Sequence, residues 1–301
     1  MTAWLVEDTE CFELRGPFGM DFEVSVAPPP GHAAASADKR WPALLVLDAP
    51  STFATAVATA RVQYALRAVE PVVVVGISTP RREGAQMMGL NRLRYLTPGA
   101  PKKSSPDVAL VLKSMAEPMR AKGWGFDDCF GGAAAFLAFL GDVLRPELGS
   151  RWAVDTNDLG LFGHSAAGAF AAFALLEGSP VFTRYLIGTF GTQWWGDYAA
   201  HESAFVAGRR AASPVRSTRV YHAVGGAELT DPAFAHAGIG LPSVQQLGAM
   251  GLPGLDIRTQ IFDGENHGSV ISHTLSSGIR ILYGTGHDFG AGLKARLDER
   301  S

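Results

Sequence analysis

The fold of this chain is decided by the stretch Leu159-Gly160-Leu161-Phe162-Gly163-His164-Ser165-Ala166-Ala167-Gly168-Ala169-Phe170. A short apolar run enters a turn of small residues, one serine stands at the turn, and an Ala/Phe-rich pattern typical of a helix follows. This order predicts a nucleophile elbow, in which a tight turn lifts the serine hydroxyl clear of a sheet. The N-terminus of the following helix would then direct backbone N–H groups at developing negative charge.

The elbow pattern G-x-S-x-G is met only in part. Ala167 occupies the second glycine position, and Gly168 follows it directly. An ordinary strand-to-helix turn with a capping Ser165 gives the same local pattern. The motif alone therefore leaves both interpretations open, and the rest of the chain has to decide.

Composition and charge narrow the class of protein. The 301 residues are 47% hydrophobic, which supports a sizeable core in one large α/β domain or two smaller ones. The formal net charge of −3 favours neither nucleic acid nor an anionic membrane surface as a partner. Cys11 and Cys129 match no metal or redox spacing and are interpreted as free thiols. The dispersed histidines show no ligand spacing, so we expect no metal and no cofactor.

The sequence carries no signal for export or for a membrane span. The acidic stretch 1–16 lacks a basic segment followed by an apolar one, so it does not resemble a signal peptide. No apolar run reaches the roughly 18–20 residues that a membrane span needs. The longest candidates, Gly131–Leu140 and Ala166–Leu176, are interpreted as buried helices. We therefore expect a soluble, cytoplasmic protein.

Predicted strands and helices alternate, which favours a mostly parallel sheet with helices on both faces in a single domain over 1–301. We expect strands at Asp21–Ala27 (edge or near-edge), Trp41–Asp48, Pro71–Ile77, Asp158–Phe162, Tyr185–Phe190, Thr218–Val224 and Asp256–Phe262. We expect helices at Thr52–Val69, Asp107–Lys122, Gly131–Leu144, Ser165–Gly178, Ala199–Ala207, Gly268–Tyr283 and Asp288–Glu299. The stretch Ser78–Ser105 shows no period and is interpreted as a long loop, functional or partly disordered.

A serine nucleophile needs an adjacent base, normally a histidine that a carboxylate orients. Ligand-facing residues of such a sheet lie at the carboxyl ends of its strands, and His267 follows the last predicted strand. The acid is expected after the strand before it, where Glu228 is the first choice and Asp231 the second. Asp263 and Glu265, close to His267 in sequence, are alternatives for orienting it.

The remaining histidines near the site have less prominent expected roles. His273 falls beyond the start of the next helix and is interpreted as structural or exposed. Two further histidines are His222, inside a strand, and His164, beside the serine. We expect them to pack in the core or to contact the catalytic residues without touching the substrate.

Further motifs, in the same order along the chain, carry a family resemblance. Leu47-Asp48-Ala49-Pro50-Ser51-Thr52-Phe53 is similar to L-D-G-x-x-x-F, Val74-Val75-Gly76-Ile77 to V-V-G-I, and Arg92-Leu93-Arg94-Tyr95-Leu96-Thr97-Pro98 to R-x-R-D-x-T-P. The resemblance continues along the chain with Gly131-Gly132-Ala133, Phe136-Leu137, Gly163-His164-Ser165, Trp194-Trp195, Glu265-Asn266-His267-Gly268-Ser269-Val270 and Leu282-Tyr283-Gly284. The chain therefore resembles the branch of the α/β-hydrolases that holds esterase D and the enterobactin-type siderophore esterases.

This resemblance implies an α/β-hydrolase fold and a serine ester hydrolase. Ser165 would be the nucleophile, His267 the base and Glu228 the acid, acting on a small-molecule ester through an acyl-enzyme. The amide of Ala166 would supply one oxyanion donor, and the loop Asp48–Phe53 the other. Siderophore lactones are the substrate that the family suggests.

The chain departs from the family pattern at positions of this site. Tyr95 stands where the family has Asp, and Ala49 replaces the glycine after Asp48. Pro50 stands where the second oxyanion donor is expected, although proline has no N–H. Either Ala49 or Ser51 donates instead, or the hole is weakened, and losing one donor costs on the order of 100–1,000-fold in rate.

Two alternatives to a hydrolase therefore stay open. An acyltransferase or cyclase would use the same acyl-enzyme but exclude water. A non-catalytic binding protein on a hydrolase scaffold also stays open, because of the departures at Pro50, Ala167 and Tyr95. The segment Arg81–Arg94 is interpreted either as the border of the entrance to the substrate site or as a solvated basic loop. The pair Trp194-Trp195 is interpreted either as part of the pocket wall or as core packing. Oligomeric state is not predicted.

Overall fold

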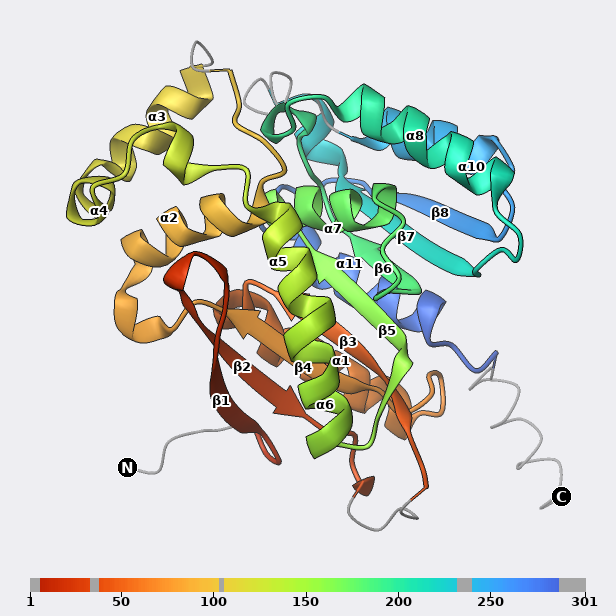
Figure 1. The fold of residues 1–301 in the computed structure, drawn as a ribbon. Helices are drawn as coiled ribbons and strands as arrows, with labels where there is room; N and C mark the ends of the chain where they lie inside the picture. Colours follow the sequence, from red (N-terminus) through yellow and green to blue (C-terminus); the bar gives the residue numbers. More distant parts are fainter. Residues whose placement is uncertain (1–5, 33–37, 103–105, 232–239, 287–301) are drawn as a thin grey trace, which may run out of the picture.

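An eight-stranded sheet crosses the molecule in the order β1-β2-β4-β3-β5-β6-β7-β8 (Figure 1). This computed structural model describes residues 6–32, 38–102, 106–231 and 240–286. The strands are β1 (Glu10–Arg15), β2 (Asp21–Ala27), β3 (Trp41–Leu47), β4 (Val73–Ser78), β5 (Val154–Gly163), β6 (Arg184–Ile187), β7 (Thr218–Gly225) and β8 (Leu255–Phe262). Strand β2 pairs antiparallel with β1 and with β4, and the other neighbours are parallel. The predicted mostly parallel sheet is confirmed, with β2 next to its edge.

Helices cover both faces of the sheet, as predicted (Figure 1). Helices α1 (Ala49–Ala65) and α11 (Val270–Leu282) pack on one face. On the other lie α5 (Ala133–Phe139), η5 (Leu140–Leu144), α6 (Arg145–Arg151), α7 (Ala166–Leu176), α8 (Tyr198–Ala211) and α10 (Leu241–Ala249). Two hydrophobic core clusters lie on these two faces, so each helix layer buries its own side of the sheet, and a third, smaller cluster of the described residues surrounds Leu90, Leu93, Cys129 and Phe130.

Burial explains the sequence pattern of the central elements. Strands β3 and β4 are buried at every position, as expected for continuous apolar runs that are covered on both faces. Edge strand β8 alternates between partly buried and exposed positions. Helix α7, which follows the serine, is apolar all round, and all eleven of its residues are buried. The elbow therefore stands on a rigid strand and a rigid helix.

Several elements differ from the sequence prediction. The predicted loop Ser78–Ser105 contains helix α2 (Ala85–Leu96), and the single predicted helix Asp107–Lys122 is two, α3 (Pro106–Ser114) and α4 (Ala116–Lys122). Strand β1 and helix α10 were not predicted. The predicted helix Asp288–Glu299 lies outside the described residues. Both cysteines are free, as predicted, with Cys11 exposed and Cys129 buried.

The helical stretch Asp127–Arg151 is longer than the predicted helix Gly131–Leu144. Its length and hydropathy would let it cross a membrane, contrary to the expectation that no segment is long enough. However, 44% of its apolar window is buried, and core helices of soluble proteins have the same properties. The stretch packs against the sheet and against α7 through α5 and α6 (Figure 1).

Candidate active site

The candidate residues gather along one edge of the sheet. Strands β3, β5, β6, β7 and β8 are parallel neighbours, so their carboxyl ends open at the same edge. The residues that follow these ends are Ala49 after β3, Ser165 after β5, Thr189 after β6, Glu228 after β7 and His267 after β8. Ligand sites of open α/β sheets lie at this edge, where the sequence predicted the site.

Ser165 has the backbone geometry of a nucleophile elbow. It lies between β5 and α7 with φ +62° and ψ −125°, a conformation that is uncommon for a residue with a side chain. Its N–H donates to the carbonyl of Thr189 over 2.6 Å, which fixes the turn against the end of β6. Strain held in this way is typical of functional residues.

The small residues around Ser165 allow the turn to close. A Cβ at Gly163 would collide with the backbone carbonyl of Ala167, so glycine is required there. Ala167 is fully buried at the position where the motif usually has its second glycine. Gly168 passes close to β6, because a Cβ there would lie 3.0 Å from the carbonyl of Gly188. The departure at Ala167 therefore leaves the elbow intact.

Glu228 and His267, the residues that the sequence predicted as first-choice acid and as base, lie in hydrogen-bonding contact. The Nδ1 of His267 lies 2.5 Å from Oε1 of Glu228. The Glu228 side chain is fully buried, whereas that of His267 is 32% exposed. A carboxylate at Nδ1 fixes the tautomer that leaves Nε2 free to accept a proton.

Two further donors hold the Glu228 carboxylate. Its Oε2 accepts hydrogen bonds from the Thr189 hydroxyl over 2.6 Å and from the Gly225 N–H over 2.7 Å. Burial opposes ionisation of Glu228, but the hydrogen bonds from His267, Thr189 and Gly225 outweigh it and lower the pKa of the carboxyl. Thr189, which the sequence analysis did not single out, thus contacts both the elbow and the acid.

His267 lies beside the elbow, where its ring contacts the ring of His164, the residue before the serine. The ring centroids of His164 and His267 are 4.4 Å apart. Burial and the neighbouring His267 lower the pKa of His164 to about 4, so its ring is neutral at pH 7. A Cβ at Gly188 would collide with this ring, so the glycine after β6 makes room for it. The expected packing role of His164 is confirmed.

The alternative acids lie elsewhere. Asp231 is exposed, beyond the short helix η7 (Gly226–Leu229) that carries Glu228. The Glu265 carboxylate lies 3.6 Å from Nε2 of His273, and the Glu265 backbone carbonyl accepts a hydrogen bond from the Ala227 N–H. The geometry therefore favours Glu228 over Asp231.

His222 lies fully buried in β7 and packs on the ring of Phe190 with centroids 5.7 Å apart. Burial lowers its pKa to about 3. Neither ring nitrogen has a hydrogen-bond partner within the described chain. A neutral imidazole in this position packs as predicted and titrates well below pH 7.

The loop after β3 offers one backbone donor to an oxyanion. Asp48 adopts a left-handed conformation with φ +57°, and α1 begins at the next residue. The Ser51 N–H already donates to the Asp48 carbonyl over 2.9 Å, and Pro50 has no N–H. Across the described chain, no residue accepts from the N–H of Ala49 or of Ala166. Of the two alternatives left by the sequence, Ala49 is the one with a free donor.

Arg92 ties this loop to the elbow. Its guanidinium binds both carboxylate oxygens of Asp48, with Nε–Oδ1 at 2.7 Å and Nη2–Oδ2 at 2.8 Å. The same Nη2 lies 3.3 Å from the carbonyl of His164. A bidentate pair of this kind adds geometric precision to a site. The loop after β3 and the turn after β5 are thus held by one side chain.

The other arginines of Arg81–Arg94 have protein partners away from the elbow. Arg81 pairs with Glu23 of β2, and Arg82 pairs with Glu13 of the edge strand β1. Arg94 donates to the Phe130 carbonyl.

Two aromatic residues of the family motifs lie in the core. Tyr95, which replaces the family's Asp, is buried against Phe22 and Phe136. Trp195 is buried against Phe173 and Tyr198, which favours the core interpretation, while the Trp194 side chain lies outside the described part of the chain. Among the described residues, no group of three His, Cys, Asp or Glu side chains could hold a metal ion.

A curated esterase is similar to about half of this chain. No protein-family model matches the chain. Among curated proteins it is similar to ferri-bacillibactin esterase BesA of Bacillus subtilis (strain 168), with 28% identity over 157 residues, which is 51% of this chain and 49% of the relative. The chain thus matches about half the length of that curated relative.

Solved structures extend the likeness to almost the whole chain. The BES protein from Bacillus cereus superposes with a TM-score of 0.73 at 22% identity, covering 93% of this chain and 96% of the other. The siderophore hydrolase EstB from Aspergillus nidulans gives a TM-score of 0.73 at 20% identity, covering 96% and 99%. The chain has the α/β-hydrolase fold. The similarity to the curated esterase confirms the resemblance that the sequence motifs carry, and the solved structures confirm the fold.

Proposed function

We propose that this chain is a serine ester hydrolase. The observation that carries the proposal is the buried Glu228 carboxylate at 2.5 Å from Nδ1 of His267, next to a serine with elbow geometry. A serine hydroxyl becomes nucleophilic when a base of this kind accepts its proton. The names of the similar proteins, esterases and hydrolases of siderophores, support the same reaction class.

The reaction proceeds through an acyl-enzyme. The Ser165 oxygen attacks the ester carbonyl while Nε2 of His267 takes its proton, and His267 then gives the proton to the leaving alcohol. Water attacks the resulting acyl group, His267 again acts as base, and a carboxylic acid is released. Glu228 keeps the imidazole oriented and stabilises its charged form.

The oxyanion is bound by the N–H groups of Ala166 and Ala49. Both amides lie at the first residue of a helix, α7 and α1, where the helix dipole favours negative charge. Arg92 holds the turn on either side through Asp48 and the His164 carbonyl. A second donor is therefore present without an N–H at Pro50.

The substrate is a small-molecule ester, and a siderophore lactone or ester is the first to test, because the similar proteins carry that description. The predicted cytoplasmic location and the absence of a cofactor remain predictions.

Hydrolysis of a short-chain aryl ester and of a catecholate trilactone tests the proposal. The wild type is expected to release acid from at least one of them, and Ser165→Ala to release none. Addition of an alcohol or amine acceptor separates the alternatives, because an acyltransferase or cyclase transfers the acyl group while a hydrolase forms free acid. A folded wild type that leaves every ester intact would favour a binding protein.

A further inference from the structure

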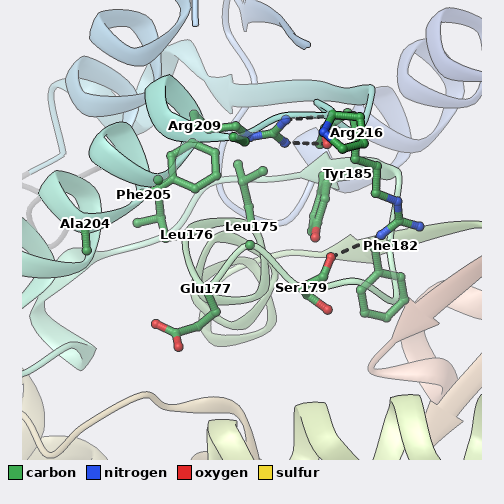
Figure 2. A pocket seen from close by; sticks show the side chains of 15 residues that line it. Leu175, Leu176, Glu177, Ser179, Phe182, Tyr185, Ala204, Phe205, Arg209 and Arg216 are labelled. Atoms are coloured by element: carbon green, nitrogen blue, oxygen red, sulfur yellow. Dashed lines mark hydrogen bonds between the residues drawn. The ribbon is translucent and has the colours of Figure 1, made fainter. Parts of the chain in front are cut away.

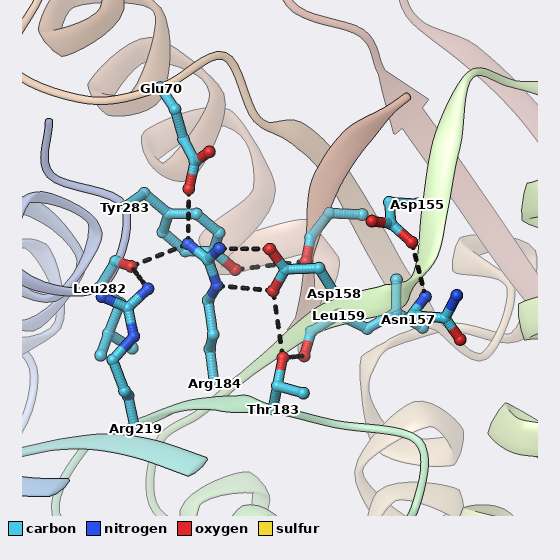
Figure 3. A network of polar contacts seen from close by, with 11 residues as sticks. Glu70, Asp155, Asn157, Asp158, Leu159, Thr183, Arg184, Arg219, Leu282 and Tyr283 are labelled. Atoms are coloured by element: carbon cyan, nitrogen blue, oxygen red, sulfur yellow. Dashed lines mark hydrogen bonds and ion pairs between the residues drawn. The ribbon is translucent and has the colours of Figure 1, made fainter. Parts of the chain in front are cut away.

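A pocket lies at the opposite edge of the sheet from Ser165, where the parallel strands begin. Its volume is about 440 Å³. It is formed where α7 ends at Leu175 and Leu176, next to the starts of β6 and β7 and one side of α8. Figure 2 shows these side chains around the end of α7. Helix α7 begins at the elbow and ends here, so its eleven residues, about 16 Å at 1.5 Å each, separate the two sites.

The floor of the pocket is apolar and rigid. It consists of buried aliphatic and aromatic side chains, namely Leu175, Leu176, Phe182, Tyr185 and Phe205. These residues come from α7, α8 and the β6 region, so the floor does not depend on a loop. A pocket of this size and lining suits the apolar body of a small organic molecule.

Two arginines give the pocket a positive rim. Arg209 donates to the Arg216 carbonyl over 2.8 Å and to the hydroxyl of Thr218, and Arg216 donates to the Ser179 carbonyl over 3.3 Å. In Figure 2, Arg209 lies near Phe205 and Arg216 extends toward Ser179 and Phe182, and the Tyr185 side chain lies between them in this view. These bonds leave most of the ten guanidinium N–H groups available, since each arginine carries five.

In the part of the chain that the structure describes, no carboxylate pairs with either arginine. Within the described residues, neither Arg209 nor Arg216 forms an ion pair, and the one lining carboxylate, Glu177, lies 2.6 Å from His201. Burial lowers the pKa of Arg209, and the positive charge of Arg216 adds to that effect. Two neighbouring cations over an apolar floor are stabilised when an anion enters.

We propose that this pocket binds a small monocarboxylate with an alkyl or aryl body. The carboxylate lies between Arg209 and Arg216, which can bind it through charge-assisted hydrogen bonds. The apolar body lies on Phe182, Tyr185 and Phe205. The site is separate from the ester-hydrolysing edge and does not depend on the chemistry proposed there.

Titration calorimetry with sodium octanoate tests this proposal on the full chain. A ligand of this size is expected to bind one equivalent with a Kd of about 1 mM or tighter. Octan-1-ol and octylammonium have the same body without the negative charge, so they should bind at least about tenfold more weakly. Ser165→Ala should bind octanoate like the wild type, whether or not the chain hydrolyses esters.

Variants with matched controls locate the site. Arg216→Gln is expected to weaken octanoate binding by about tenfold or more, and Arg210→Gln, an exposed neighbour on α8 outside the pocket lining, to leave it unchanged. Gly208→Phe is expected to abolish binding. Gly208 lines the pocket and a Cβ there meets no atom within 4 Å, so the phenylalanine ring has room to extend into the pocket and occupy the ligand's place. Ala211→Phe on the same helix, outside the lining, should bind normally.

Three outcomes would overturn the proposal. One is that octanoate fails to saturate the wild type at about 10 mM, far above the expected Kd. Another is that octan-1-ol binds the wild type as tightly as octanoate does. The third is that Arg210→Gln weakens octanoate binding as much as Arg216→Gln does. Thermal unfolding of each variant shows whether it is folded. Arg216 is exposed, and among the described residues its side chain donates one hydrogen bond, to the Ser179 carbonyl, so its variant is expected to fold.

Discussion

The substitution Glu228→Gln isolates the role of the buried acid, because the hydrogen bonds around it fix how the amide must lie. Oε2 of Glu228 accepts from the Gly225 N–H, which can only donate. The amide oxygen of glutamine must therefore stay on that side, and its NH₂ group must face Nδ1 of His267. An NH₂ donor there favours the tautomer with its proton on Nε2, which cannot accept the proton of Ser165.

The expected loss of activity is large. A carboxylate-to-amide change that imposes the wrong tautomer lowers kcat by about 10⁴-fold, which corresponds to about 5.4 kcal/mol at 1.36 kcal/mol per tenfold. The side chain keeps its volume and its bond from Gly225, so we expect the fold to persist. The assay compares kcat/KM for a short-chain aryl ester, together with the rate of labelling by a fluorophosphonate.

Asp231→Asn is the matched control. Asp231 is the other acid that the sequence predicted, and it lies exposed beyond η7. Its amide variant should retain activity within about twofold of wild type, since surface changes of this kind have small effects. Retention of more than a tenth of the activity in Glu228→Gln, or a larger loss in Asp231→Asn, would refute the assignment of the acid.

Three further changes test the surroundings of the site. Thr189→Val removes the hydroxyl donor from the buried carboxylate and should lower the free energy of unfolding at pH 7 by about 2 kcal/mol, measured by urea denaturation. Gly188→Ala forces a methyl group into the ring of His164 and should destabilise by about 1–3 kcal/mol, whereas Gly196→Ala, where a Cβ meets nothing within 4 Å, should not. His222 has a folded pKa of about 3, below its unfolded value of 6.5, so the unfolded state binds the extra proton and stability falls as pH falls through this range. In His222→Phe, the slope of the free energy of unfolding against pH should decrease by about 1.4 kcal/mol per pH unit between these two pKa values. An unchanged slope would contradict the lowered pKa of His222.

The parts of the fold that could be predicted are those in which the local pattern of apolar residues matches the pattern of burial. Strand β3 is buried at all seven positions, and its sequence is correspondingly apolar throughout. Helix α2 was missed because its amphipathic pattern is weak, with Gly89 and two arginines among buried residues such as Leu93. What orders α2 is partly the ion pair of Arg92 with Asp48, a contact between residues 44 positions apart that no local pattern reveals.

The same division holds for the site. Chain order and strand ends were sufficient to predict that Ser165, Glu228 and His267 lie at one edge of the sheet, because parallel strands bring their carboxyl ends there. The contribution of Thr189 could not be predicted, since it depends on how the turn after β6 meets both β5 and β7. The choice of Ala49 over Ser51 likewise required the backbone hydrogen bond from Ser51 to Asp48.

Whether Ser165 is an activated nucleophile is tested most directly by intact-protein mass spectrometry after treatment with a fluorophosphonate. Wild type, Ser165→Ala and His267→Ala are compared under identical conditions, with thermal unfolding as the check of folding. We predict one adduct on the wild type, none on Ser165→Ala, and much slower labelling of His267→Ala, because the base no longer accepts the serine proton. An unlabelled but folded wild type, or equal labelling of Ser165→Ala, would contradict a serine hydrolase.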